Sequence, residues 1–292
     1  MDKPFWTSDH TALYAKYRPK SPPIIAQKTL NFMKDMGTSF ECLVDVGCGS
    51  GQSTEIFAGY FKKIIGLDIS PNQIWWARKG NKFDNIDFQV GSCDNIPVTD
   101  KSVDLVTCAH AAHWFDLDEF FKECKRVLKP NGCLMLRCSE LPYMYPVKST
   151  SEGLRKYDDD LAKLGQSLSR EFYGKCKFSE RSLLCEDHYS TIFSMLSCRH
   201  KIHEDNIFVK IESSLEDFRN LCSTFSGYQT YVEEKQAELI KGHTNDVINQ
   251  DDILEEFIEK CKNSWELQTF ANDEIQLHVV RSAFYILASE FN

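Results

Sequence analysis

Short apolar runs alternate with amphipathic stretches between about residues 41 and 139. The runs are rich in β-branched residues and cover residues 42–46, 64–67, 86–90, 103–108 and 133–136. Apolar runs separated by helical stretches are typical of a parallel sheet with crossover helices on its faces. The pattern therefore predicts an α/β core over this part of the chain.

The clearest helical pattern covers residues 117–128, where apolar positions recur on one face of a helix. These positions are Leu117, Phe120, Phe121, Cys124, Val127 and Leu128. The following Lys129, Pro130 and Gly132 combine a cation, a helix breaker and a residue that tolerates positive φ. We expect this helix to pack on the sheet and to end there, before the chain enters the next strand.

The second half of the chain breaks this alternation. Residues 140–195 open with a loop that contains Pro142 and Pro146, and a polar helical segment follows, which we interpret as a cap over a substrate. Amphipathic helices are predicted around 215–225 and 253–261. Alternation over 275–280 followed by an aromatic stretch predicts a final strand, paired antiparallel at the sheet edge.

Composition excludes several classes of protein. With 292 residues, 42% hydrophobic and 26% charged, the chain can bury a sizeable core. Its net charge of −9 argues against binding to nucleic acid or to an anionic membrane. No apolar run is long enough to span a membrane, and the first residues lack the layout of a signal peptide, so we expect a cytoplasmic protein. The twelve cysteines lie within apolar patterns and are expected to be reduced.

A glycine-rich turn directly follows the first apolar run. Glycines at this position allow a tight turn and a close approach of the backbone to a ligand, and a helix predicted from about Ser53 would add free N–H groups. The spacing Gly-x-Gly-x-Gly differs from that of dinucleotide-binding proteins, and the preceding acidic residue suits a cationic group, such as the α-ammonium of S-adenosylmethionine. The predicted contacts are Asp45, Gly47, Cys48, Gly49 and Gly51.

A second carboxylate ends the next apolar run. Asp68 lies 21 residues after Gly47, a spacing at which a carboxylate accepts both ribose hydroxyls of a nucleotide. The third run ends at the same edge of the predicted sheet, where an adenine ring and its amino group would lie. The candidates for the adenine are Ile69, Ser92, Cys93 and Asp94.

The order of these motifs, at residues 44–51, 66–70 and 102–106, resembles class I S-adenosylmethionine-dependent methyltransferases. Residues 14–19, 110–115 and 225–228 and the aromatic final strand are similar to the trans-aconitate methyltransferase-like group. The resemblance covers nearly the whole chain. It implies a Rossmann-like sheet of seven strands with the last strand antiparallel, and a helical cap inserted after the fifth strand. It also implies a small acceptor, because known members methylate small carboxylic acids or small lipophilic compounds.

The same resemblance suggests a division of the chain. Residues 1–40 would form a lid over the cofactor, 41–139 the cofactor-binding core, and 140–195 the substrate cap. Residues 196–292 would complete the sheet and add the C-terminal helices.

Several residues are candidates for the acceptor side. His113 and Trp114 follow the 103–108 run, at the carboxyl edge where open α/β sheets bind ligands. His113 is either the catalytic base or a hydrogen-bonded structural histidine, and His110 either contacts the cofactor or caps the strand. Arg18 is either a carboxylate anchor or an ordinary exposed arginine. Tyr14, Tyr17 and Tyr228 either wall off water from the methyl group or are ordinary half-buried tyrosines.

Two positions depart from the family pattern. Ser92 stands where many relatives have an aspartate that contacts adenine. Arg137, Cys138 and Ser139 stand where the aconitate-methylating relatives have a tryptophan and a tyrosine. Arg137 is therefore a candidate second carboxylate anchor, and the acceptor need not be trans-aconitate.

These observations predict a methyltransferase for a small molecule, most simply a carboxylic acid that becomes a methyl ester. One alternative is methylation of oxygen, nitrogen or carbon with His113 as base, and another is a catalytically inactive S-adenosylmethionine-binding protein. No metal is expected, because Cys198, His200 and His203 lack a second pair of ligands at a finger-like spacing. Protein partners are not predicted.

Overall fold

The computed structural model describes residues 8–19, 21–147, 159–240 and 252–291. The chain forms two compact units. The larger unit comprises residues 5–140, 180–207 and 282–292, and the smaller unit is built mainly of residues 141–179 and 208–281. Residues of the predicted cap, 140–195, therefore occur in both units.

The larger unit contains the predicted parallel sheet. Its strands follow the order β3-β2-β1-β4-β5, with a parallel pairing at each step. Because the strands are parallel, their carboxyl ends meet at one edge of the sheet. The strands are β1 (Cys42–Val46), β2 (Lys63–Asp68), β3 (Ile86–Val90), β4 (Val103–Ala109) and β5 (Leu128–Ser139).

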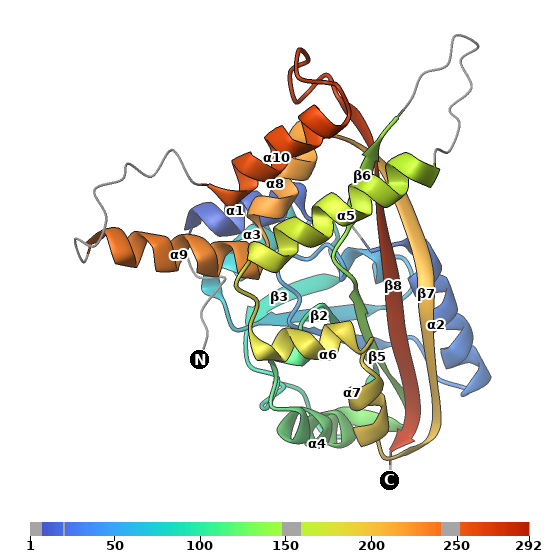
Figure 1. The fold of residues 1–292 in the computed structure, drawn as a ribbon. Coiled ribbons are helices and arrows are strands. Elements are labelled where there is room, and N and C mark those ends of the chain that lie inside the picture. The colour runs from blue at the N-terminus through green and yellow to red at the C-terminus, as the bar shows by residue number, and fades with distance from the viewer. Residues whose placement is uncertain (1–7, 20, 148–158, 241–251, 292) are drawn as a thin grey trace. The chain divides into compact units, whose positions relative to one another are not determined.

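The final strand, β8 (Gln276–Phe291), is antiparallel as predicted, but it does not lie at the sheet edge. Its residues 283–289 pair with β5, and residues 277–280 pair with β6 (Tyr143–Pro146). β7 (Cys198–Ser214) also pairs with β8, so β8 is an interior strand (Figure 1). Almost every residue of β8 is buried, which suits an interior strand with both faces covered.

The strand count also differs from the expectation. The described residues contain an eight-stranded sheet rather than seven strands. β6 lies in the segment that the two prolines led us to predict as a loop. Pro146 lies in β6, which is an edge strand of this sheet, where a missing N–H is tolerated.

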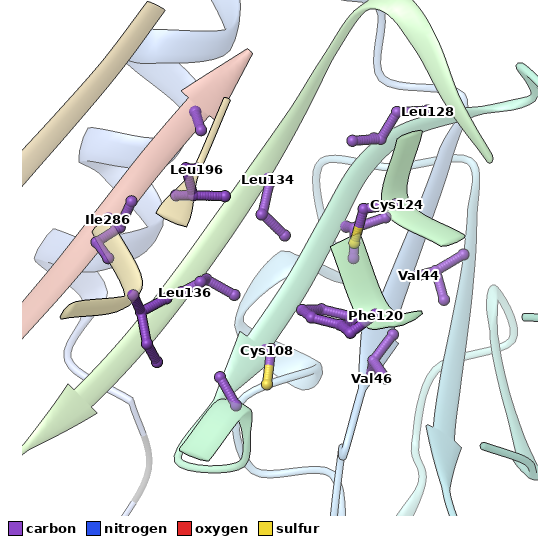
Figure 2. Packing of buried hydrophobic residues seen from close by; sticks show 14 of the residues in the cluster. Val44, Val46, Cys108, Phe120, Cys124, Leu128, Leu134, Leu136, Leu196 and Ile286 are labelled. Carbon is purple, nitrogen blue, oxygen red and sulfur yellow. The ribbon is translucent and has the colours of Figure 1, made fainter. Parts of the chain in front are cut away.

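Side chains on alternate positions of each strand enter two separate cores, one on each face of the sheet. Val44 and Val46 of β1 face Phe120 and Cys124 on one face (Figure 2), whereas Leu43 enters the opposite core. Both faces are therefore covered, as in other parallel sheets. One face packs against α2 (Pro23–Asp35) and α3 (Pro71–Gly80), the other against α4 (Leu117–Val127), α6 (Leu183–Glu186) and α7 (Ser190–Met195).

α4 confirms the helix predicted from the apolar spacing. Asp116 caps its first turn by accepting a hydrogen bond from the N–H of Glu119, and the helix ends at Val127, before Pro130. Phe120 is fully buried, with its ring 5.0 Å from the ring of Phe115. Phe120 therefore packs α4 against the sheet.

The smaller unit has a core of its own. Phe172 stacks on Phe257 with ring centroids 4.7 Å apart, and Phe218 contributes to the same cluster. The predicted amphipathic helices are present as α8 and α10. The helices of this unit are α5 (Asp159–Lys175), α8 (Leu215–Ser223), α9 (Ser226–Ile240) and α10 (Ile253–Ser264).

None of the helices in the described part of the chain is long and apolar enough to cross a membrane. All twelve cysteines are free thiols in the structure.

Replacing Phe120 with Ala should destabilise the protein by about 3–5 kcal/mol, because the change leaves a cavity between α4 and the sheet. The free energy of unfolding from urea titration measures this loss. Phe83→Ala is the matched control, since that phenylalanine is 39% exposed and should lose less than about 1 kcal/mol. Equal losses in the two variants would contradict this description of the core.

Candidate active site

The chain turns sharply after β1, and glycine is required there. Gly47, Gly49 and Gly51 have φ values of +71°, +55° and +92°. A Cβ at Gly47 would lie 2.5 Å from the Cβ of Ala111, and one at Gly51 would lie 2.8 Å from the ring of Phe88. Any larger residue would therefore combine backbone strain with a steric clash.

Backbone hydrogen bonds hold this glycine turn against the end of β2. The N–H groups of Gly47 and Cys48 donate to the carbonyl oxygen of Leu67, at 2.7 and 2.9 Å. The N–H of Gly49 donates to Oδ2 of Asp68 at 2.9 Å, and the N–H of Ser70 donates to Oδ1 at 2.8 Å. Burial raises the pKa of Asp68. The carboxylate is thus fixed beside the turn, and each oxygen retains a second lone pair for a ligand.

The prediction of a regular helix directly after the turn is wrong. The structure has only the short 3-10 helix η1 (Glu55–Phe57) within a series of tight turns. Phe57, Ala58 and Phe61 are all buried, so this segment packs closely against the core as turns. It therefore does not offer the N-terminus of a regular helix to a ligand.

Asp45 lies beneath the turn and is 1% exposed. Oδ2 accepts a hydrogen bond from the hydroxyl of Thr54 at 2.5 Å, and Oδ1 accepts one from Thr107 at 2.8 Å. Burial raises the pKa of Asp45 to about 6. The structure shows Asp45 supporting the turn, while its contact with an ammonium group stays a prediction.

The end of β3 lies beside Asp68. Val90, the register partner of Asp68, is 53% exposed, and Ile69 is 52% exposed. Ser92 and Cys93 are half-buried and Asp94 is exposed. Apolar surface next to a carboxylate is the environment that a flat base attached to a ribose requires.

The first helix, α1 (Ser8–Tyr17), reaches the glycine turn. A Cβ at Gly49 would lie 3.8 Å from the ring of Tyr14, and the Arg18 guanidinium lies 4.8 Å above that ring. Lys16 lies over the ring of Tyr17 at 4.7 Å. Of the three tyrosines predicted for the site, Tyr14 therefore lies beside the glycine turn.

Arg137, at the carboxyl end of β5, is 2% exposed. Its Nη1 donates to the hydroxyl of Ser21 at 2.7 Å, and Ser21 in turn lies 2.7 Å from the hydroxyl of Ser53. Its Nε has no hydrogen-bond partner among the described residues. Burial lowers the pKa of Arg137 to about 10, so the group remains a cation at neutral pH.

His113 is also buried, at 8% exposed. Its Nδ1 lies 2.9 Å from the hydroxyl of Tyr189 and 3.3 Å from Sγ of Cys185. Burial lowers the pKa of His113, so its imidazole is neutral at pH 7. The ring of Trp114 lies 5.1 Å from that of His113.

His110 adopts a left-handed backbone conformation, with φ at +59°. Its N–H donates to the carbonyl oxygen of Arg137 at 2.8 Å, and its Nδ1 lies 3.3 Å from Sγ of Cys138. A non-glycine residue in this conformation is uncommon and is a frequent feature of functional sites.

Tyr228 belongs to the smaller unit, where its hydroxyl donates to Oδ2 of Asp252 at 2.7 Å. Its place in the acceptor site stays a prediction.

Sequence reasoning missed Ser21, Cys185 and Tyr189. Ser21 precedes α2, and the other two come from a segment more than forty residues after the end of β5. None of them belongs to a motif with a recognisable spacing, so only the tertiary structure brings them to these positions.

Comparisons with known proteins show which proteins this chain is similar to. Residues 44–136 match the methyltransferase domain family. A Dictyostelium discoideum protein named as a methyltransferase is 44% identical over 199 residues, which cover 68% of each chain. A malonyl-[acyl-carrier protein] O-methyltransferase from Coxiella burnetii is 32% identical over 76% of this chain and 79% of its own length.

Among solved structures, a protein of Anaeromyxobacter dehalogenans described as a type II methyltransferase shares the fold. The TM-score is 0.63 at 19% sequence identity, and the alignment covers 94% of this chain and 99% of that chain.

The chain belongs to the methyltransferase family and, within it, to the class I S-adenosylmethionine-dependent enzymes. The family and the cofactor inferred from the sequence are thereby confirmed.

Replacing Gly47 with Ala should weaken binding of S-adenosylhomocysteine at least tenfold, because the new Cβ pushes the turn away from Ala111. Calorimetric titration measures the affinity. Gly37→Ala is the matched control, since Gly37 has a similar φ of +66° but no atom within 4 Å of the added Cβ. Equal losses of affinity in both variants would assign the effect to backbone strain alone.

The raised pKa of Asp45 leads to a pH-dependent prediction. If the ionised carboxylate pairs with the ligand ammonium, affinity for S-adenosylhomocysteine should fall about tenfold from pH 7 to pH 5, because Asp45 becomes protonated below about pH 6. 5′-Methylthioadenosine, which has no ammonium group, should bind equally at both pH values. A parallel fall for both ligands would show that Asp45 only supports the turn.

Proposed function

We propose that this enzyme transfers the methyl group of S-adenosylmethionine to a carboxylate of a small molecule and forms a methyl ester. The observation that carries the proposal is the buried guanidinium of Arg137. No carboxylate of the described residues pairs with this cation, and a carboxylate acceptor would supply the counter-ion that a buried cation requires.

The residues at the carboxyl edge fit the cofactor. The glycine turn provides backbone without side chains, as a closely approaching ligand requires, and Asp68 has free lone pairs for the ribose hydroxyls. Exposed Ile69 would lie against the adenine, and Ser92 or Asp94 would take its amino group. Asp45 or His110 would contact the amino-acid part.

The reaction requires mainly that the protein position the acceptor against the cofactor and exclude water. When bound, S-adenosylmethionine supplies a methyl group that its sulfonium already activates. A carboxylate is ionised at neutral pH and needs no general base. Arg137 and Arg18 would orient the acceptor, while Tyr14, Tyr17 and Trp114 would exclude water.

The Coxiella burnetii relative supports a carboxylate acceptor. It is an O-methyltransferase for malonyl-[acyl-carrier protein], and the oxygen available for methylation in a malonyl thioester is that of its free carboxylate. The trans-aconitate methyltransferase-like group, which the sequence resembles, methylates small carboxylic acids or small lipophilic compounds. Within this class we propose no particular acid.

Methylation of a hydroxyl, nitrogen or carbon is the second candidate. The lowered pKa of His113 keeps its imidazole neutral, as a general base must be. Its Nδ1 already contacts Tyr189 and Cys185, so Nε2 would have to accept the proton.

The test uses methyl-labelled S-adenosylmethionine and a small-molecule extract of the source cells. We expect labelled product that releases volatile methanol in mild alkali, because esters hydrolyse there whereas ethers and methylamines do not. Label that is stable to alkali would contradict the carboxylate proposal and favour the His113 mechanism. Absence of any transfer would favour a protein that only binds the cofactor.

Replacing Arg137 with Met should lower the rate of label transfer at limiting acceptor about 100-fold or more, since a buried charged hydrogen bond contributes several kcal/mol. Affinity for S-adenosylhomocysteine should change little. Arg199→Met is the matched control, because that side chain is 74% exposed and should retain full activity. Unchanged transfer in the Arg137 variant would remove Arg137 from the acceptor site.

A further inference from the structure

A compact group of soft ligand atoms lies on one face of the sheet in the larger unit. Sγ of Cys138 lies 3.6 Å from Sγ of Cys185, and Sγ of Cys185 lies 3.3 Å from Nδ1 of His113. The three ligand atoms lie within 4.8 Å of one another. They come from η2 (Ala112–Trp114), the end of β5 and α6, and methyl transfer to a carboxylate uses neither thiol.

Two of the three separations are close to those in the ligand sphere of a single metal ion. Zinc binds cysteine sulfur at about 2.3 Å and histidine nitrogen at about 2.0–2.1 Å in tetrahedral geometry, which places neighbouring ligand atoms about 3.4–3.8 Å apart. The observed distances of 3.3 and 3.6 Å are close to this range. The third pair, His113 and Cys138, lies within 4.8 Å, so an ion between the three atoms would draw these two side chains closer together.

The surroundings of the cluster suit such a site. Cys138 and His113 are 3% and 8% exposed, and Cys185 is half-buried, so an ion would be shielded yet reachable. Nδ1 of His110 contacts Cys138 at 3.3 Å, as an outer contact that orients a thiolate ligand. The hydroxyl of Tyr189 shares Nδ1 of His113 and would give up that hydrogen bond when an ion binds.

We propose that His113, Cys138 and Cys185 form a binding site for one soft divalent metal ion of the zinc class. Three protein ligands leave a fourth position open for water or for a small anionic ligand. The ion would tie three segments together that are distant in the sequence. The proposal does not depend on the identity of the methyl acceptor.

Linear spacing could not reveal this site. The cysteine and histidines at 198, 200 and 203, which have a more suggestive spacing, do not form such a group. Nε2 of His203 contacts the backbone oxygen of His188, and Sγ of Cys198 contacts that of His200. In the described part of the chain, the cluster at 113, 138 and 185 is the group with metal-binding geometry.

The first test measures metal in the full-length wild-type protein, purified under reducing conditions without chelator. Elemental analysis should find about one equivalent of zinc. After the protein is stripped with a chelator, added Co²⁺ should produce a thiolate-to-cobalt absorption band and the visible bands of a tetrahedral site, saturating at one equivalent. Less than about a tenth of an equivalent of zinc, together with no thiolate band, would overturn the proposal.

Substitutions locate the site. Cys138→Ser and Cys185→Ser should each weaken cobalt binding more than about 100-fold, since even outer contacts change metal affinity about 10- to 100-fold. Cys198→Ser is the matched control, because this half-buried cysteine of the larger unit lies outside the cluster and should leave the spectrum unchanged. A thiolate band that persists in both cluster variants would overturn the assignment.

Two further measurements need no substitution. Zinc returned to stripped wild-type protein should raise the midpoint of thermal unfolding reversibly, because the ion binds the folded state. Thiol titration of the denatured protein should find all twelve cysteines reduced. A count of ten, with the disulfide mapped to Cys138 and Cys185 by peptide mass spectrometry, would contradict the metal site.

Discussion

The hydrogen bonds between the glycine turn and the end of β2 are the constraint on which the cofactor site depends. They bring the backbone of residues 47–49 against the carbonyl oxygen of Leu67 and the carboxylate of Asp68. The turn reaches this position only because its glycines adopt positive φ and because Ala111 and Phe88 leave no space for a Cβ. Parallel pairing then sets the ends of β3 and β4 at the same edge.

The alternation of side chains along β5 separates two kinds of chemistry. Leu136 and Cys138 point into the core that contains α4, and Met135 enters the opposite core. Arg137 lies two residues after Met135, so its side chain points to the same face of the sheet, toward Ser21 and the segment after the glycine turn. The end of β5 therefore carries the buried cation of the proposed acceptor site on one face and a thiol of the proposed metal site on the other.

Features with a local physical cause were predictable from the sequence. The strand runs, the helix that ends before Pro130 and the glycine turn all depend on spacing and on residue type within a short window. Asp68 was predictable because a fixed crossover length separates it from the turn. The interior position of β8 was not predictable from the sequence. The strands β6 and β7 that pair with β8 come from segments that carry no strong strand signal. Likewise, only the fold brings Cys185 and Tyr189 to His113, or Ser21 to Arg137.

We propose that the cofactor binds at the carboxyl edge of the sheet, between the glycine turn and Asp68. A crystal structure of the protein with S-adenosylhomocysteine tests it most directly. We predict that the ribose hydroxyls contact the Asp68 carboxylate and that the adenine lies against Ile69. Ligand bound elsewhere, or bound with its ribose away from Asp68, would contradict this placement of the cofactor.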